Sequence, residues 1–320
     1  MKLLSGNNDK KDILKLNLSK IGRRCRIADS NYVVFKLDDF GGKMTINRQS
    51  QDILHGIVLY MFLEYLKYFS IGILDGVIAG LLGIGGGVII IPILLYIASV
   101  DTKTATAMSA VQVFFASSFG TLFNWFQKTI NFRYALIFGL SSGITYFLGS
   151  YFTNLIPDIS IKIIYLCSVI VAIVLFFIKR KHSKSEEDLA LISKKIPCKK
   201  DYFIIIPIAL VAGFSFGILG VGGGFLYVPL LILLFDFPLK VAIGTSLMIV
   251  LCNAIPGIIG KLLVIRFDIY IAIALAVGAI LGSRLGTYLN KKLKDIVIKI
   301  VFIVILLVII VRVVMDLYLS

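Results

Sequence analysis

Two short glycine-rich motifs are the part of this sequence best suited to chemistry. Residues 83–87 are Gly-Ile-Gly-Gly-Gly and residues 220–224 are Gly-Val-Gly-Gly-Gly, each flanked by apolar runs. Each glycine costs about 1 kcal/mol relative to alanine inside a helix, so we predict that a helix breaks at each motif. The chain after a break begins with unpaired backbone N–H groups at the positive end of a helix dipole. A small oxyanion is the ligand that this arrangement favours.

We therefore expect the glycine triplets to contribute to a substrate-binding site, together with hydroxyl groups of the segments that follow them. Serine and threonine hydroxyls can donate hydrogen bonds to an anion, and such charge-assisted bonds are strong. The alternative interpretation is that the glycines only permit close helix packing and that the hydroxyls bond back to their own helices. The predicted substrate-binding residues are Gly85, Gly86, Gly87, Ser109, Gly222, Gly223, Gly224, Thr245 and Ser246.

The apolar runs around these motifs define the class of protein. Of the 320 residues, 58% are hydrophobic and only 16% are charged, whereas about a quarter of the residues in a soluble domain are charged. Runs of this kind are long enough to cross a hydrocarbon core of about 30 Å as helices. Stretches such as 161–178 are continuously apolar and lack the alternation of a transmembrane β-barrel. We predict an all-α, polytopic protein of the cell membrane, with the lipid bilayer as its surroundings.

The apolar segments form two related series of five. Six glycines and a proline match between the series at a constant offset of 137 positions, from Gly76 with Gly213 to Pro92 with Pro229. Because five is an odd number, the two copies of this internal duplication should enter the membrane from opposite sides, which predicts an inverted-topology repeat whose broken helices meet near the midplane. The predicted segments are 66–83, 86–99, 104–124, 132–153 and 160–178, followed by 202–220, 223–236, 240–260, 267–288 and 296–316.

Four regions follow from this pattern. Residues 1–52 form a polar tail, expected to be disordered or weakly structured and without the apolar stretch of a signal peptide; Met44 and Met61 leave a later translation start open as a hypothesis. Residues 53–178 form the first transmembrane repeat, in which 53–65 is either an interfacial helix or an extension of the next segment. Residues 179–201 form a charged loop, placed in the cytoplasm by its lysines, and residues 202–320 form the second repeat.

Prolines and ionisable residues inside these segments add further predictions. Pro92 and Pro229 lie five residues beyond their triplets, too far along for the first helical turn, so we expect each to kink its helix. Asp75 and Arg284 are the ionisable residues most embedded in apolar sequence, and such residues are functional candidates because a charge in the bilayer is costly. Asp75 is a candidate for carrying a coupling proton. Arg284 stands near the end of its segment, from which its side chain can extend to the membrane interface.

Several other classes of function are disfavoured. The net charge is +15, and the lysines and arginines that produce it lie between the apolar runs, as expected for cytoplasmic loops. They do not form the folded basic face that would bind nucleic acid. The four cysteines and two histidines have no metal-ligand spacing, so we expect no metal, cofactor or disulfide framework. There is no phosphate-binding GxxxxGK[ST] loop, which argues against an ATP-driven pump, and no Ser–His pair at membrane depth, which argues against an enzyme.

The paired motifs resemble those of the sulfite exporter TauE/SafE family of membrane transporters. That resemblance covers about residues 66–316 and implies export of sulfite, sulfonates or other small sulfur-containing anions by a secondary transporter. A passive anion channel remains an alternative, and a membrane-embedded enzyme or assembly factor is a weaker one. The substrate, direction, coupling ion and any homo-oligomer are left open. The matching residues are Gly80, Gly83, Gly85, Gly86, Gly87 and Pro92, then Gly217, Gly220, Gly222, Gly223, Gly224 and Pro229.

Overall fold

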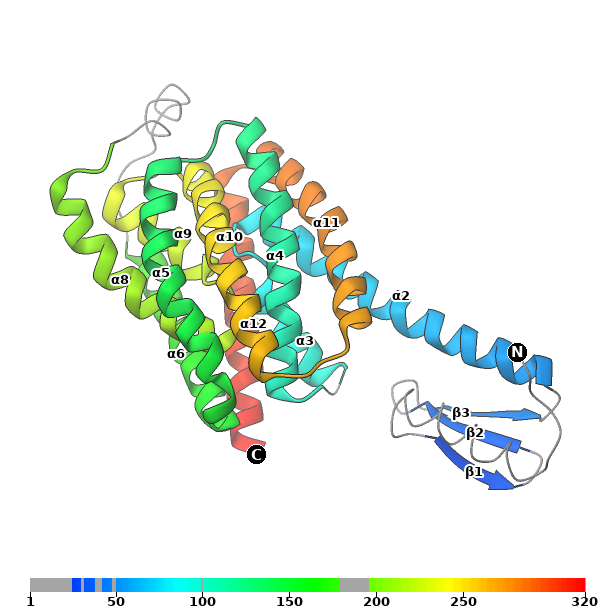
Figure 1. Ribbon diagram of the computed structural model, residues 1–320. Helices are drawn as coiled ribbons and strands as arrows, with labels where there is room; N and C mark the ends of the chain where they lie inside the picture. Colours follow the sequence, from blue (N-terminus) through cyan, green and yellow to red (C-terminus); the bar gives the residue numbers. More distant parts are fainter. Residues whose placement is uncertain are drawn as a thin grey trace. The chain divides into compact units, whose positions relative to one another are not determined.

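The computed structural model describes residues 25–29, 32–37, 42–47, 50–98, 100–178 and 196–319. The chain divides into two compact units, Met1–Glu64 and Tyr65–Ser320. Figure 1 labels the strands of the smaller unit and the helices of the larger one. Most of the charged loop predicted at 179–201 lies outside the described residues, so its side of the membrane stays a prediction.

The smaller unit contains an antiparallel sheet that the sequence analysis did not anticipate. Its strands β1 (Cys25–Asp29), β2 (Tyr32–Leu37) and β3 (Gly42–Asn47) lie in that order, and Val34 of β2 pairs with Arg26 and Thr45. The central strand is rich in aromatic and β-branched residues, which favour extended structure. The region predicted as a polar tail therefore contributes a small β element to an otherwise helical chain.

Helix α2 (Ser50–Leu82) is continuous from the end of the smaller unit into the larger one. Its part from Val58 to Leu82 is long and apolar enough to cross a membrane. Residues 53–65 are thus an extension of the first membrane segment and not a separate interfacial helix.

The helices of the larger unit confirm the internal duplication. The first series continues with α3 (Gly87–Tyr96), α4 (Thr102–Phe126), α5 (Phe132–Phe152) and α6 (Asp158–Phe177), with a short 3-10 turn, η1, at Thr153–Leu155. The second series is α8 (Lys199–Leu219), α9 (Gly224–Phe235), α10 (Leu239–Val264), α11 (Ile269–Lys292) and α12 (Asp295–Leu319). From α9 onward, each helix begins 137 residues after its counterpart.

The lengths of these helices confirm a multi-pass membrane protein. Within the described residues, eight helices are long and apolar enough to span a bilayer, whereas α3 and α9 are shorter apolar helices. Polar side chains set several helix starts, since Asp101, Asn131 and Asp268 accept hydrogen bonds from backbone N–H groups in the first turns of α4, α5 and α11.

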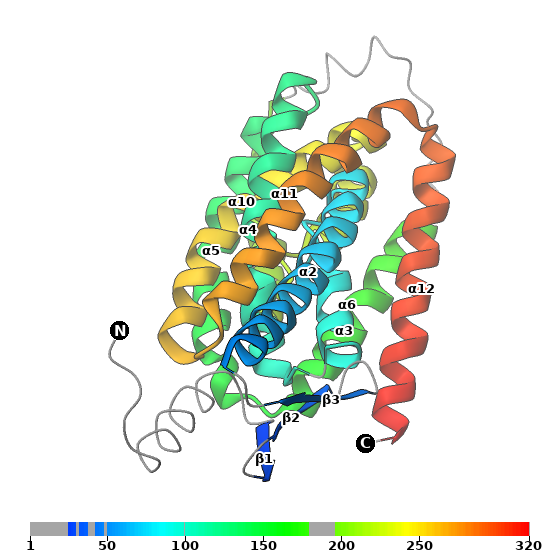
Figure 2. The ribbon, with the colours of Figure 1, turned by 90° about the vertical axis from the view of Figure 1, so that its right-hand side faces the viewer.

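Glycines bring helices of the two repeats into close contact. A Cβ added to Gly76 of α2 would lie 2.5 Å from the Ala279 carbonyl oxygen of α11, and one added to Gly80 would lie 2.4 Å from that of Ser283. The contact residue moves toward the C-terminus of α11 as the glycine moves toward the C-terminus of α2. The two helices therefore pack in parallel (Figure 2). The counterpart helices α8 and α5 do the same, because Gly213 faces Ser142 and Gly217 faces Tyr146. Close packing is therefore the role of these glycines.

Candidate substrate site

The predicted helix breaks are present at both motifs. Helix α2 ends at Leu82 and α3 begins at Gly87, while α8 ends at Leu219 and α9 begins at Gly224. We call residues 83–87 the first glycine loop and residues 220–224 the second glycine loop. Three glycines in each loop have φ between +68° and +92°, a conformation that side chains strongly disfavour. These residues are Gly83, Gly85, Gly86, Gly220, Gly222 and Gly223.

The two glycine loops meet in the interior of the larger unit. All ten loop residues are buried. A Cβ added to Gly87 would lie 2.5 Å from the Cα of Val221, and one added to Gly224 would lie 2.4 Å from the Gly83 carbonyl oxygen. The contact is reciprocal, because each triplet ends against the other loop. The glycines are required here both for backbone conformation and for this close approach.

The predicted hydroxyl groups hold the loops together across the repeats. Ser109 of α4 donates to the Gly220 carbonyl at 3.0 Å, and its counterpart Ser246 of α10 donates to the Gly83 carbonyl at 2.7 Å. Thr245 accepts a hydrogen bond of 3.0 Å from the Asn131 N–H at the start of α5. In this conformation the two serine hydroxyls therefore bond to loop carbonyls and do not point to an open anion site.

Protein groups also fill the space in front of each triplet. A Cβ on Gly86 would lie 2.3 Å from the Asp75 carboxyl oxygen Oδ2, whereas a Cβ on Gly223 would lie 2.2 Å from the Phe216 ring. The Gly222 N–H donates to the hydroxyl of Tyr146 at 3.0 Å. The first loop thus faces a carboxyl group and the second faces aromatic side chains, so the structure shows the loops in a closed arrangement.

Asp75 is fully buried and paired with an amide. Gln112 of α4, also fully buried, donates through Nε2 to Asp75 Oδ2. The remaining oxygens, Asp75 Oδ1 and Gln112 Oε1, have no hydrogen-bond partner. The counterpart positions in the second repeat are Ala212 and Ile249, so this polar pair belongs to the first repeat alone.

Pro92 and Pro229 lie inside α3 and α9, as the sequence predicts, although the kinks themselves stay a prediction. Because proline has no N–H, Pro92 leaves the Val88 carbonyl without its helical donor. The hydroxyl of Tyr165, from α6, donates to that carbonyl. Tyr165 therefore supports the first turn of α3, directly after the first glycine loop, and the sequence did not indicate this role.

Lys261 of α10 is the most informative residue that the sequence analysis missed. Its side chain is 1% exposed, and its Nζ donates to Thr106 Oγ1 at 3.1 Å, Thr153 Oγ1 at 2.7 Å and the Ile218 carbonyl at 2.7 Å. These partners are all uncharged, and no carboxylate of the described residues is bonded to it. The predicted segment ended at residue 260, whereas α10 continues to Val264 and keeps Lys261 inside the protein.

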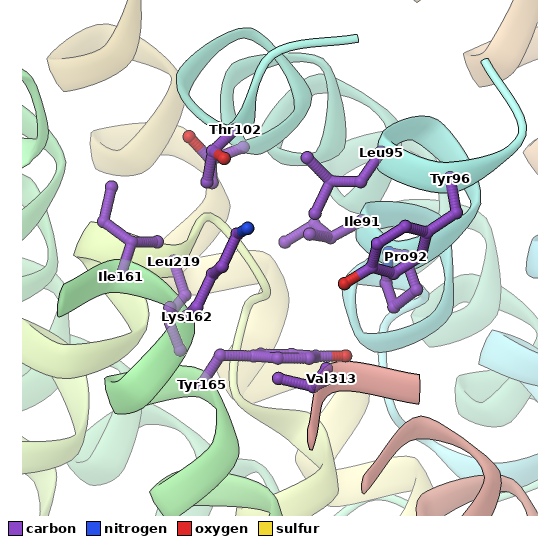
Figure 3. Close-up of a pocket in the computed structure, with 11 residues that line it drawn as sticks. Ile91, Pro92, Leu95, Tyr96, Thr102, Ile161, Lys162, Tyr165, Leu219 and Val313 are labelled. Atoms are coloured by element: carbon purple, nitrogen blue, oxygen red, sulfur yellow. The ribbon is translucent and has the colours of Figure 1, made fainter. Parts of the chain in front are cut away.

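A small cavity is lined by Thr106, one of the hydrogen-bond partners of this lysine, and by residues of α3, α4 and α6 that Figure 3 labels. Its volume is ≈ 20 Å³, which is room for about one water molecule. Thr106 both lines the cavity and accepts the hydrogen bond from Lys261. Lys162 extends from α6 into the group of lining side chains, between Thr102 and Tyr165. One lysine therefore lines the cavity, and a second is hydrogen-bonded to one of its lining residues.

Three further charged residues, Lys103, Lys240 and Arg284, make their contacts outside the glycine loops. Lys103 and Lys240 occupy equivalent positions in the first turns of α4 and α10, and each donates to a backbone carbonyl near the end of a neighbouring element. Arg284 is exposed, and its guanidinium lies 5.8 Å from the ring centroid of Phe123. This placement fits a side chain that extends toward the membrane interface.

Comparison with known proteins identifies the family. The family model for sulfite exporter TauE/SafE matches residues 68–313. The chain belongs to this family. It is 28% identical over 216 residues to the probable membrane transporter protein YunE of Bacillus subtilis, which covers 63% of this chain and 79% of YunE. It is 30% identical to a probable membrane transporter protein of Xylella fastidiosa (strain Temecula1), over 56% of this chain and 67% of that protein. No solved structure matches the chain.

The family match extends from α2 to α12 and includes both glycine loops. A third relative, the probable membrane transporter protein MJ0441 of Methanocaldococcus jannaschii, is 27% identical over 60% of this chain and 70% of its own length. This TauE/SafE family member is therefore a multi-pass membrane protein of a transporter family.

Proposed function

We propose that this protein is a secondary transporter that exports a small sulfur-containing anion, either sulfite or an organosulfonate. Membership of the TauE/SafE family supports transport. The preference for an anion rests on one observation above all, the buried ammonium group of Lys261, which has only uncharged partners beside the second glycine loop. A buried cation without a carboxylate partner favours an anionic ligand, because the ligand supplies the missing charge.

In this proposal the glycine loops form the centre of the substrate site. The starts of α3 and α9 supply backbone N–H groups, and Lys261 binds the anion as an ammonium group, because the anion supplies the counter-charge that burial otherwise denies it. The closed loops must separate for substrate to enter, and rocking of one repeat against the other is the movement that transporters with repeats commonly use. When the loops separate, the hydroxyl groups of Ser109 and Ser246 leave the loop carbonyls and donate to the substrate instead. Each hydroxyl has one proton, so it cannot bond to the carbonyl and the anion at the same time.

The packing of the repeats supports an inverted topology. Helix α2 is the first of its series and α11 the fourth of the other, and they run in parallel, as α8 and α5 do. With successive helices alternating in direction, the first and fourth helices of one series run oppositely. Parallel packing between the first helix of one repeat and the fourth of the other therefore supports opposite entry of the two repeats, with a site at their interface.

Flux measurements with the purified protein in liposomes test this function. Labelled sulfite and a simple sulfonate such as methanesulfonate should enter in a saturable manner and show counterflow, in which unlabelled substrate inside accelerates uptake. Lys261→Met should reduce this flux by about tenfold to a hundredfold, as expected for the loss of a charged hydrogen-bond donor. Lys299→Met, on an exposed lysine of α12, is the matched control.

The same measurement separates the competing functions. Flux that is not saturable and shows no counterflow would identify a passive anion channel. Absence of flux for both anions would refute the proposed substrate class. Comparison of right-side-out and inside-out vesicles tests the direction, because an exporter should load inside-out vesicles.

A further inference from the structure

The Asp75–Gln112 pair has the atoms of a protonated acid–amide pair. One hydrogen bond is made, from Gln112 Nε2 to Asp75 Oδ2. The two oxygens left over, Asp75 Oδ1 and Gln112 Oε1, are buried acceptors without partners. A primary amide and a carboxylic acid can form a cyclic pair in which the amide N–H meets one carboxyl oxygen and the carboxyl O–H meets the amide oxygen. One proton on Asp75 Oδ1 would provide that second bond and satisfy both oxygens.

Burial of Asp75 favours the neutral acid, and this effect is larger than the opposite effect of the Gln112 amide and the Ile90 N–H, which favour the carboxylate. Tyr165 of α6 is a titratable side chain near Asp75, and its hydroxyl donates to the Val88 carbonyl and not to the carboxyl group. Helix α11 places Leu275 against Gly72 and Ala279 against Gly76, on either side of the level of Asp75. Within the described residues, no cation is bonded to the Asp75 carboxyl group. A buried carboxylate that lacks such a partner is strongly disfavoured.

A metal cation fits this place less well than a proton. Hard cations such as Ca²⁺ take six or more oxygen ligands, or keep several waters as Mg²⁺ does, whereas Asp75 and Gln112 offer two unpartnered oxygens. No group of three or more acidic, histidine or cysteine side chains suited to a metal occurs in the described part of the chain. A proton needs neither extra ligands nor extra space.

The position of Asp75 links this proton to the anion. Its carboxyl lies against Gly86, and the backbone N–H of Ile90 in the first turn of α3 interacts with it. This is the helix terminus that the proposed function assigns to substrate. A carboxylate and a substrate anion at one helix terminus repel each other, whereas a neutral carboxylic acid leaves the positive end of the dipole to the substrate.

We propose that Asp75 is the proton site of this transporter and that it binds a proton together with the anion. The carboxyl takes the proton from the aqueous side from which substrate enters and returns it to water on the opposite side, so that proton and anion move in the same direction. This linkage rests on the proposed function, whereas the protonation of Asp75 in the closed conformation does not. The counterpart Ala212 has no such group, so the expected ratio is one proton per transport cycle.

Asp75→Asn is the decisive variant, because asparagine imitates the neutral acid and can still pair with Gln112. In liposomes that contain a pH-sensitive dye, wild-type flux should carry protons, and apparent anion affinity should change by about tenfold per pH unit where Asp75 titrates. The variant should move the anion without protons and with an affinity that varies less than about twofold over the same range. Asp158→Asn, at the exposed start of α6, is the control and should retain proton movement.

An infrared readout that needs no substrate keeps the two proposals separable. The carbonyl stretch of a protonated carboxylic acid should be present in the wild-type protein and absent in Asp75→Asn. If wild-type protein moves neither sulfite nor methanesulfonate but shows this band, the proposed function fails and the proton site stands. If the band is absent, or if Asp75→Asn still moves protons with the anion, the inference is refuted. A flux that requires sodium instead of protons would also overturn it.

Discussion

Replacing Lys261 by methionine separates stability from function more sharply than any other single change. The hydrogen bonds around the lysine allow the effect to be worked out. After its removal Thr153 Oγ1 can donate its one proton either to the Ile218 carbonyl at 3.2 Å or to the Gly149 carbonyl at 3.0 Å, and Thr106 still donates to the Lys103 carbonyl. No buried donor therefore loses its acceptor, and methionine fills a similar volume with apolar atoms.

Burial of an ammonium group costs several kcal/mol, and replacement of buried ionic groups by apolar side chains is often neutral or stabilising by about 1–4 kcal/mol. We therefore expect Lys261→Met to unfold at the same temperature as the wild-type protein or higher, while flux falls by about tenfold to a hundredfold. Thermal unfolding in detergent and flux in liposomes measure the two quantities. A variant that is less stable and transports normally would show that Lys261 only holds the end of α8, and would refute the role of its charge.

Three further predictions concern the loops and the topology. Gly86→Val and Gly223→Val should abolish flux, because both glycines have positive φ and the new Cβ atoms would lie 2.3 and 2.2 Å from neighbouring side chains. Gly143→Ala is the control and should transport, because the nearest atom to its Cβ lies at 3.7 Å. Ser246→Ala leaves the Gly83 carbonyl without its 2.7 Å donor and should lower stability by about 1–3 kcal/mol as well as reduce flux, so unchanged thermal unfolding would count against the loop contact. Ser183→Cys should resist membrane-impermeant thiol reagents applied outside intact cells, because residues 179–201 are predicted to be cytoplasmic; its labelling would reverse the topology.

Sequence alone was sufficient for the helix breaks because the cause is local. Gly83, Gly85 and Gly86 adopt positive φ, and glycine is the residue that does so without strain. The duplication was also accessible, since it requires only a constant offset between matching residues. The sheet at residues 25–47 was missed because its cause is not local. Pairing of short strands of mixed charge depends on partner strands that the pattern of a single segment does not reveal.

The partners of the hydroxyl and charged groups could not be predicted because they come from distant parts of the chain. Ser109 bonds a carbonyl 111 positions away and Ser246 one 163 positions away. Lys261 appeared to end a membrane segment, and only the packing of α4 and α8 around it reveals its burial. Residue types indicated that hydroxyl groups matter near the glycine loops, whereas their acceptors depend on how the two repeats interlock.

The two repeats share their scaffold and differ in their charges, and this difference bears on mechanism. Glycines with positive φ and the serines that hold the opposite loop occur in both repeats. Asp75 occurs in the first repeat alone, where Ala212 is its counterpart, and Lys261 in the second alone, where Asn124 is its counterpart. The duplicated features can serve a symmetric opening and closing of the loops. The acid in one repeat and the base in the other make opening toward one side of the membrane chemically different from opening toward the other side. In the proposed mechanism, this asymmetric pair links the movement of the repeats to one proton and one anion.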